Sequence, residues 1–265
     1  MKTLICIPTY NEAENIEPLV RDVLAATAGT GAGVGATEVH VLVADDNSPD
    51  GTGKIVDRLV AESGGRVFAL HRERKAGLGQ AYVAAFRWGL ERGYDRLIEM
   101  DADFSHHPRY LPTMLSTLDA ADVAIGSRNI AGGGTVNWGI GRKILSRGGS
   151  LYARIILGAP IHDFTGGFNG WRREVIEAVD LASLRSDGYS FQIELKYRAF
   201  RRGYRIREFP IVFEDRKVGA SKMHRRIVLE ALKRVWEFRF RAMKNDLTLP
   251  SDSSSAAPTS SGSRR

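Results

Sequence analysis

The chain has a single cysteine, Cys6, among its 265 residues. One thiol excludes a framework of intramolecular disulfide bonds, and its place in an apolar run predicts a buried small side chain. A reducing, cytoplasmic setting is the expectation that follows. The first residues also lack the apolar core of a secretory signal peptide, because the charged residues Glu12 and Glu14 come too early.

Long hydrophobic runs are absent as well. No apolar stretch reaches the roughly 18 residues of a membrane-spanning helix, so we expect any membrane contact to be peripheral. Two glycine-rich segments, 29–35 and 51–54, look like nucleotide-binding loops but lack the spacing. The first precedes a strand instead of following one, and in the second Ser48 stands where a P-loop needs its first glycine. Neither segment therefore predicts a phosphate loop.

Positive charge is concentrated late in the chain. The formal net charge is +7, yet residues 196–245 hold 16 Lys and Arg against 5 Asp and Glu, so the remainder is net acidic. A cationic segment of this kind suits phosphates, anionic lipid or nucleic acid. Because the sequence has no base-stacking motif and no recognised nucleic-acid-binding motif, we expect no nucleic-acid partner.

Short apolar strands alternate with helical patterns in the first half, which predicts an α/β fold with a parallel sheet and crossover helices. The expected strands are Thr3–Ile7, Val39–Ala44, Val67–Leu70, Leu97–Met100 and Val123–Ile125. The expected helices are Glu14–Ala26, Thr52–Ala61, Leu78–Glu91 and Arg109–Leu118. Ligands of such sheets bind at the carboxyl ends of strands, where three polar clusters of this chain fall.

The second half is less regular. We expect a glycine-rich loop at 132–134, a helix near 142–157, a glycine turn at 166–167, a helix near 191–202 and a strand at 206–213. An amphipathic, basic helix over 225–245 suits a membrane surface, the protein's own core or a partner subunit. The Ser- and Pro-rich tail, 246–265, is predicted to be disordered. The catalytic domain is then expected over 1–224.

The third polar cluster contains two carboxylates one residue apart, Asp101 and Asp103, at the end of an apolar run. Their charges repel each other unless a cation lies between them, and hard oxygen ligands suit Mg²⁺ or Mn²⁺. This pattern indicates phosphate chemistry.

The first two clusters are compatible with a nucleotide. Tyr10 offers an aromatic face and Glu12 a carboxylate at a helix start, although an ordinary helix cap explains Asn11 or Glu12 alone. Asp45 and Asp46 form a carboxylate pair that a turn does not need, and Asp46 is placed to accept from a base edge or a ribose hydroxyl.

The motifs occur in an order that resembles a known family. They are Pro8-Thr9-Tyr10-Asn11-Glu12, the 45–52 run, Gly77-Leu78-Gly79, Met100 to Pro108, Ser127-Arg128, Arg142 to Gly148, Asp163 to Phe168 and Asp215 to Lys222. Together they resemble the dolichyl-phosphate (polyprenyl-phosphate) mannose synthases, which are inverting family 2 glycosyltransferases with the GT-A fold. The resemblance runs from about Lys2 to Lys244 and is most specific where the 216–222 run joins the other motifs.

The resemblance implies GDP-mannose as donor, polyprenyl (dolichyl) phosphate as acceptor and a divalent metal. It places Pro8, Tyr10, Glu12, Ala44 and Asp46 around the nucleotide, with Asp101, Ala102 and Asp103 at the diphosphate and Asp101 and Asp103 on the metal. Arg128, Arg216 and Lys222 hold donor or acceptor phosphates and, with Asp103, make up the implied catalytic set. Arg142 and Ser146, four apart on one helical face, look like a clamp for the acceptor phosphate. Ser105 stands where some relatives have a metal-holding Gln, and Asn169 replaces the usual Arg or Lys.

The expected mechanism needs no general base, because a lipid phosphate is already anionic at neutral pH. Three histidines, His106, His107 and His162, are accordingly interpreted as structural. Two alternatives stay open: a polyprenyl-phosphate glucosyltransferase or other family 2 sugar transferase, and a non-catalytic nucleotide-sugar-binding subunit of a membrane complex. Since the acceptor is a lipid, we expect peripheral binding to the cytosolic face of a membrane, through a membrane-anchoring partner protein or the 225–245 helix.

Overall fold

The computed structural model of the chain describes residues 1–29, 37–184, 186, 188–214 and 232–240. Its main sheet consists of β1 (Lys2–Thr9), β2 (Glu38–Asp45), β3 (Val67–His71), β4 (Arg96–Glu99), β5 (Val123–Ser127), β7 (Asn169–Arg172) and β8 (Ile206–Pro210). The strand order is β3-β2-β1-β4-β7-β5-β8, and every pairing is parallel except those of β7 with β4 and β5. A two-stranded parallel sheet joins β6 (Gly134–Val136) to β9 (Val212–Glu214).

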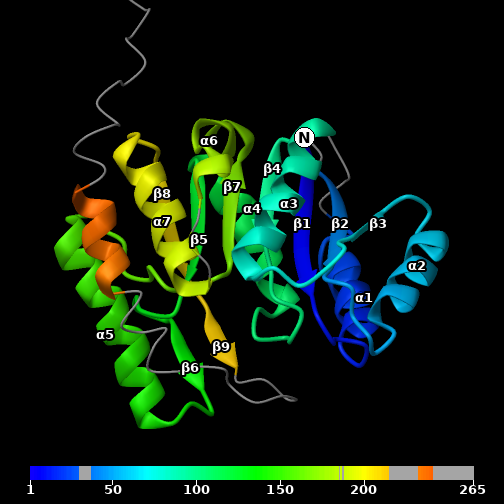
Figure 1. The fold of residues 1–265 in the computed structure, drawn as a ribbon, viewed down its shortest axis with the longest axis horizontal. Coiled ribbons are helices and arrows are strands. Elements are labelled where there is room, and N and C mark those ends of the chain that lie inside the picture. Colours follow the sequence, from blue (N-terminus) through cyan, green and yellow to red (C-terminus); the bar gives the residue numbers. More distant parts are fainter. Residues whose placement is uncertain (30–36, 185, 187, 215–231, 241–265) are drawn as a thin grey trace, which may run out of the picture.

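Helices lie on both faces of the main sheet (Figure 1). They are α1 (Ile16–Ala26), α2 (Thr52–Glu62), α3 (Leu78–Glu91), α4 (Leu111–Ala120), α5 (Ile140–Leu157), α6 (Arg173–Ala178) and α7 (Gly188–Arg201), with 3-10 turns η1 (Pro108–Tyr110) and η2 (Leu181–Ser183). Residues 232–240 form a further helix, drawn in orange beside α5.

The sheet separates two hydrophobic cores. Alternate residues of a strand point to opposite faces, so Ile5 and Ile7 of β1 enter one core while Leu4 and Cys6 enter the other. Helices α1, α2 and α4 contribute to the first core, and α3, α5, α6 and α7 to the second. Because both faces are covered, β1, β2, β4 and β5 are almost continuously buried, whereas the edge strands β3 and β8 are partly exposed.

The regular βα alternation of the first half was predicted correctly, and the fold is mostly parallel α/β as expected. Two strand predictions were wrong in detail. β4 ends at Glu99, one residue before the predicted end. The strand predicted at 206–213 is two strands, because the chain leaves β5 after Pro210 and pairs with β6 from Val212. Strands β6 and β7 and helix α6 were not predicted. Within the described ranges, no helix combines the length and the hydropathy needed to cross a membrane.

Candidate active site

Three loops meet at one edge of the sheet because β2, β1 and β4 are neighbours and run in the same direction. Each loop contains a non-glycine residue with a left-handed backbone: Asn11 with φ 61°, Asn47 with φ 57° and Phe104 with φ 62°. Asparagine tolerates this region, but a bulky residue such as Phe104 adopts it at a cost, which functional sites often carry. Because the three strands are parallel neighbours, their carboxyl ends lie at one edge, which confirms the predicted convergence of the three polar clusters.

The first two loops are joined by side-chain hydrogen bonds. Asp45, buried at the end of β2, accepts from the Thr9 hydroxyl at 3.0 Å and from the Ser48 hydroxyl at 2.6 Å. The Thr52 hydroxyl accepts from the backbone N–H of Glu12 at 3.0 Å, and Asp50 accepts from that of Ala13. Asp45 thus fixes the loops in place, while its neighbour Asp46 is directed elsewhere.

Asp46 pairs with a cation that the sequence analysis did not identify. Its carboxylate accepts a hydrogen bond from Arg72, and burial raises the pKa of Asp46 while Arg72 opposes that rise. In the same loop, the Lys75 ammonium lies 3.8 Å from the centre of the Tyr10 ring. The run Arg72-Glu73-Arg74-Lys75 before Gly77-Leu78-Gly79 was the available signal. A cationic loop therefore borders the predicted nucleotide site.

The other predicted nucleotide residues differ in what they expose. Pro8 and Ala44 are buried, so they shape the floor of this region rather than project from it. Glu12 is partly exposed, and its carboxylate accepts from the Asn15 side chain at 2.8 Å.

The Asp101–Asp103 loop is stabilised by short-range contacts. The backbone N–H of Asp101 donates to His106 Nδ1 at 3.0 Å, and Asp103 Oδ1 accepts from the Ser105 N–H at 3.0 Å. Ala102 is buried between the two carboxylates. The Ser105 hydroxyl is buried and has no hydrogen-bond partner among the described residues. A buried hydroxyl without a hydrogen-bond partner lowers the stability of the fold unless a bound group supplies that partner.

The carboxylates of Asp101 and Asp103 and the Ser105 hydroxyl form a donor set that fits a divalent cation. In the described parts of the chain, no group of three or more His, Cys, Asp or Glu side chains could hold a metal ion by itself. Mg²⁺ and related hard ions in phosphate-transfer sites are usually held by one or two carboxylates, with substrate phosphates and water completing the shell. Two carboxylates and one hydroxyl match that pattern, whereas a dedicated protein-only metal cage does not occur in these residues.

His106 supports this loop rather than offering a base. Burial lowers the pKa of His106, so Nδ1 stays an acceptor for the Asp101 N–H, and the ring stacks 5.2 Å from that of Phe168. His107 accepts from the Arg109 N–H at the start of η1, and His162 contacts Glu208 at 2.7 Å. All three histidines have structural contacts, in agreement with their interpretation from the sequence.

Arg128 is buried in an ion pair that the sequence did not indicate. Its Nε and Nη2 each donate to Asp163 at 2.7 Å, and Nη2 also donates to Thr165 at 3.0 Å. The Arg128 guanidinium holds the pKa of Asp163 far below its usual range despite burial. Only Nη1 lacks a hydrogen bond within the described residues, so Nη1 is the atom of Arg128 that remains for a phosphate.

A buried lysine donates hydrogen bonds to the chain around the glycine turn, residues 163–166. Lys196 of α7 donates from Nζ to the carbonyls of Asp163, Phe164 and Gly166 at 2.8, 3.3 and 2.7 Å. Burial lowers the pKa of Lys196 to about 8, against the opposing charges of Asp163 and Glu99. The glycine turn is thereby held at both its acidic side chain and its carbonyls.

The departure at Asn169 has a structural explanation. The Asn169 side chain donates to Glu99 at 2.9 Å, to the Gly166 carbonyl at 3.2 Å and to Gln192 at 2.8 Å. Burial raises the pKa of Glu99 to about 7, and its hydrogen bonds oppose that rise. Asn169 is therefore a link in the buried network beneath the turn, and no cation at this position is needed.

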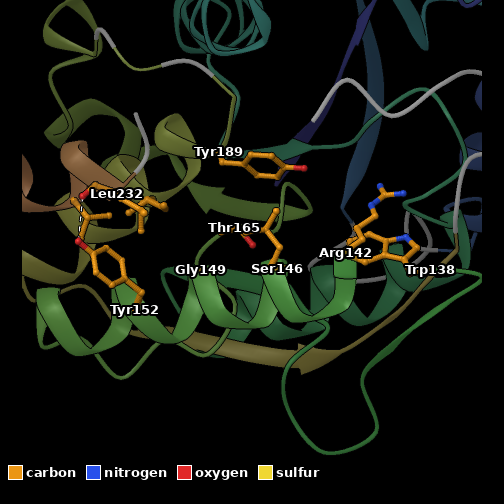
Figure 2. Close-up of a pocket in the computed structure, with 11 residues that line it drawn as sticks. Trp138, Arg142, Ser146, Gly149, Tyr152, Thr165, Tyr189 and Leu232 are labelled. Atoms are coloured by element: carbon orange, nitrogen blue, oxygen red, sulfur yellow. Dashed lines mark hydrogen bonds between the residues drawn. The ribbon is translucent and has the colours of Figure 1, made fainter. Parts of the chain in front are cut away.

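A largely apolar pocket lies along α5 and contains both residues of the predicted clamp. It is lined by Trp138, Arg142, Leu145, Ser146, Gly149, Tyr152, Thr165, Tyr189, Ile193, Leu232 and Val235. Figure 2 shows Ser146 beside Thr165 beneath Tyr189, with Arg142 next to Trp138. The Arg142 guanidinium lies 3.9 Å from the Trp138 ring centre. Since Thr165 bonds Arg128, the pocket adjoins the glycine turn.

Two predicted phosphate-binding residues, Arg216 and Lys222, lie outside the described residues. The same holds for the 246–265 tail and for most of the helix predicted over 225–245, of which 232–240 is described and helical.

Comparisons with known proteins show the family to which the chain belongs. The model of the family described as glycosyl transferase family 2 matches residues 4–180. The polyprenol monophosphomannose synthase of Mycolicibacterium smegmatis is 47% identical over 241 residues, covering 91% of this chain and 88% of that protein. The undecaprenyl-phosphate mannosyltransferase of Micrococcus luteus is 48% identical over 232 residues, covering 88% of this chain and 91% of that protein.

Solved structures share the fold at low sequence identity. The glucosyl-3-phosphoglycerate synthase of Mycobacterium tuberculosis, in complex with Mn²⁺, UDP and glucosyl-3-phosphoglycerate, has a TM-score of 0.60 at 18% identity, covering 91% of this chain and 79% of that one. A mannosyltransferase from Pyrobaculum calidifontis, in complex with GDP-Man and Mn²⁺, has a TM-score of 0.55 at 17% identity, covering 91% and 74%. These similarities confirm the expected GT-A fold.

Proposed function

Because this chain belongs to glycosyltransferase family 2, we propose that it transfers mannose from GDP-mannose to a polyprenyl (dolichyl) phosphate, with inversion at the anomeric carbon. The observation that carries this proposal is the 47–48% identity to a polyprenol monophosphomannose synthase and an undecaprenyl-phosphate mannosyltransferase, each over nearly its whole length. The residues that the family resemblance implies at the donor are intact, and three of their loops meet at one sheet edge.

The donor site is proposed at the ends of β1, β2 and β4. Tyr10 and Asp46 lie there with Lys75 and Arg72 as neighbours, which suits the base and ribose of a nucleotide. Asp101 and Asp103 would hold Mg²⁺ or Mn²⁺; the ion supplies positive charge for the diphosphate as GDP departs. The Mn²⁺ in the two solved structures above supports a divalent ion and leaves the choice of metal open.

The acceptor is proposed to enter from the α5 pocket. Its phosphate carries the nucleophilic oxygen and is anionic at neutral pH, so no side chain has to remove a proton. Arg142 offers charge and Ser146 a hydroxyl one helical turn apart, and the apolar lining suits the first prenyl units. Arg128, through Nη1, and the undescribed Arg216 and Lys222 remain proposed contacts for the phosphates.

A donor screen tests the reaction. Purified protein with GDP-mannose, Mg²⁺ or Mn²⁺ and a polyprenyl phosphate should form a mannolipid, and the product should have the inverted β configuration by NMR. Formation of a lipid-linked sugar only from UDP-glucose would favour the glucosyltransferase alternative. Binding of GDP-mannose without turnover would favour the non-catalytic subunit. Either result contradicts the proposal.

Binding to a membrane surface is proposed through the exposed side of α5. Ile140, Ile144, Leu151 and Ile155 are 78%, 67%, 55% and 68% exposed, and their spacing places them on one face of the helix. The 18-residue helix contains Arg142, Lys143, Arg147 and Arg154 and no acidic residue. A face of this kind suits the interface of an anionic bilayer. Trp236 and Phe240 of the 232–240 helix, which lies beside α5, are also exposed.

Flotation with liposomes tests this surface separately from the chemistry. The I144E/I155E variant should lose binding to anionic vesicles while retaining transfer to a short, water-soluble prenyl phosphate. The matched control A61E/S116E adds the same charge at exposed positions of α2 and α4 and should float like the wild type. Equal flotation of both variants would assign membrane binding to another segment or to a partner protein.

A further inference from the structure

Asp101 is contacted by a tyrosine that the proposed function has not used. The Tyr82 hydroxyl donates to Asp101 Oδ1 at 3.1 Å. This is the one side-chain hydrogen bond that the Asp101 carboxylate receives from the described residues. The other oxygen, Oδ2, lies 3.8 Å from His106 Nδ1, beyond hydrogen-bonding distance. The two oxygens of this carboxylate are therefore in different environments.

Tyr82 is well placed to hold one orientation of the carboxylate. It is completely buried on α3, and its ring stacks on that of Phe191 with centroids 6.2 Å apart and planes 7° from parallel. The ring of Phe86 lies 6.1 Å away. The packed ring therefore directs the hydroxyl at Asp101.

We propose that Tyr82 is a positioning residue of the donor site: its hydroxyl occupies Asp101 Oδ1 and so presents Oδ2 to the divalent cation. This inference rests on the proposed metal site of Asp101 and Asp103. Groups that orient metal-ligating carboxylates in this way typically alter metal affinity about 10- to 100-fold when they are removed. Tyr82 touches neither sugar nor acceptor phosphate in this scheme, so its effect is on the metal.

The test is Tyr82→Phe, which removes one oxygen and keeps the ring. Mn²⁺ binding in the presence of GDP is followed by electron paramagnetic resonance, without turnover. The variant should bind Mn²⁺ about 10-fold or more weakly. In the transfer assay the Mn²⁺ concentration for half-maximal rate should rise in proportion, while the KM for the lipid acceptor stays at the wild-type value.

Two control variants separate the hydroxyl from packing. Tyr94→Phe removes another buried tyrosine hydroxyl, which contacts His40 Nδ1 at 2.8 Å and is remote from Asp101, and it should bind Mn²⁺ like the wild type. Phe191→Leu disturbs the ring stack and keeps the Tyr82 hydroxyl. If Phe191→Leu weakens Mn²⁺ binding as much as Tyr82→Phe, the effect is one of packing and the proposal is overturned.

The remaining outcomes are also distinct. Unchanged Mn²⁺ binding by Tyr82→Phe, with a wild type that binds Mn²⁺ and transfers mannose, overturns the role of Tyr82 alone. A wild type that binds no Mn²⁺ in the presence of GDP overturns the metal site of the proposed function together with this inference.

Discussion

The two sides of the active-site edge hold their charges in different ways. At the end of β4 the Asp103 carboxylate accepts a hydrogen bond from its own loop, through the Ser105 N–H two residues away. Around the glycine turn the charges are buried and paired over long separations. Arg128 and Asp163 are 35 residues apart, and Lys196 is 33 residues from the Asp163 carbonyl that it bonds.

This difference separates chemistry from folding. A charge held by its own loop can be altered without disturbing packing elsewhere, and it faces the region where a ligand binds. A charge buried among distant elements leaves an uncompensated partner when it is removed. Asp103 should therefore affect turnover more than stability, and the network around Asp163 should affect stability first.

The largest effect is expected for Asp163→Asn. The substitution removes the charge that compensates Arg128 and also weakens the field at Lys196, both buried. Breaking a buried pair costs about 3–5 kcal/mol of the free energy of unfolding, as measured by urea denaturation. The control Glu17→Gln breaks exposed pairs with Arg21 and Arg58 and should leave the unfolding free energy nearly unchanged. Equal stabilities for the two variants would show that the buried Asp163 network contributes no more to folding than an exposed ion pair.

The second prediction concerns the opposite side. Asp103→Asn keeps an oxygen that can accept from the Ser105 N–H, so the unfolding free energy should stay within about 1 kcal/mol of the wild type. Turnover should fall about 100- to 1,000-fold, because one charge opposite the departing diphosphate is lost. Rates are measured at saturating donor and metal. Retained turnover would argue against the metal assignment. A loss of stability as large as that of Asp163→Asn would show that Asp103 matters as much to folding as the buried network around Asp163.

The same contrast explains what the sequence could predict. Asp46, Asp101 and Asp103 follow apolar strands directly, and parallel strands end at a common edge, so short-range pattern was sufficient to bring them together. Helices α1 to α4 follow from the same alternation. Lys196 and its partners gave no such signal, because each partner is at least 30 residues away.

For Arg128, the sequence alone could not distinguish between two structural roles. A lone arginine after a strand has the same sequence signature whether it is exposed to a phosphate or paired with a buried carboxylate. The family resemblance implied the first role, and the structure adds the second through Asp163. Strand β7 was missed for a related reason: four residues, Asn169–Arg172, between a glycine turn and a short helix carry too little periodicity to be recognised.

The third prediction uses pH to examine the buried lysine. The pKa of Lys196 is about 8 in the folded chain against 10.5 for an ordinary lysine, so between these values the unfolded chain binds more protons. The unfolding free energy contributed by this group therefore rises as pH increases from about 8 to about 10.5 and is lost as pH falls through 8. Lys196→Met should lack that rise and, at pH 7, lose about 1–3 kcal/mol because the three carbonyls of the turn lose their donor.

Urea denaturation of both proteins at pH 7, 8.5 and 9.5 measures the difference. Asp163, Arg128 and Glu208 are present in both proteins, but Lys196 lowers the pKa of Glu99, so loss of the lysine also changes the Glu99 titration. The comparison is therefore made in a Glu99→Gln background, where this second titration is absent. A difference in unfolding free energy between wild type and variant that does not grow with pH would show that the pKa of Lys196 is not lowered in the folded chain.

The smallest effect is expected for Ser105→Ala, which tests the third side chain of the metal loop. The Ser105 hydroxyl is buried and has no hydrogen-bond partner among the described residues, so its removal should leave the unfolding free energy unchanged or raise it by up to about 1 kcal/mol. If the hydroxyl, directly or through a water, completes the cation shell of Asp101 and Asp103, Mn²⁺ affinity should nevertheless fall by a few-fold, on the order of 1 kcal/mol. The control Ser116→Ala removes a hydroxyl that bonds its own helix on α4 and should leave Mn²⁺ affinity unchanged. Unchanged affinity in Ser105→Ala would instead leave the metal to the two carboxylates, the diphosphate and water.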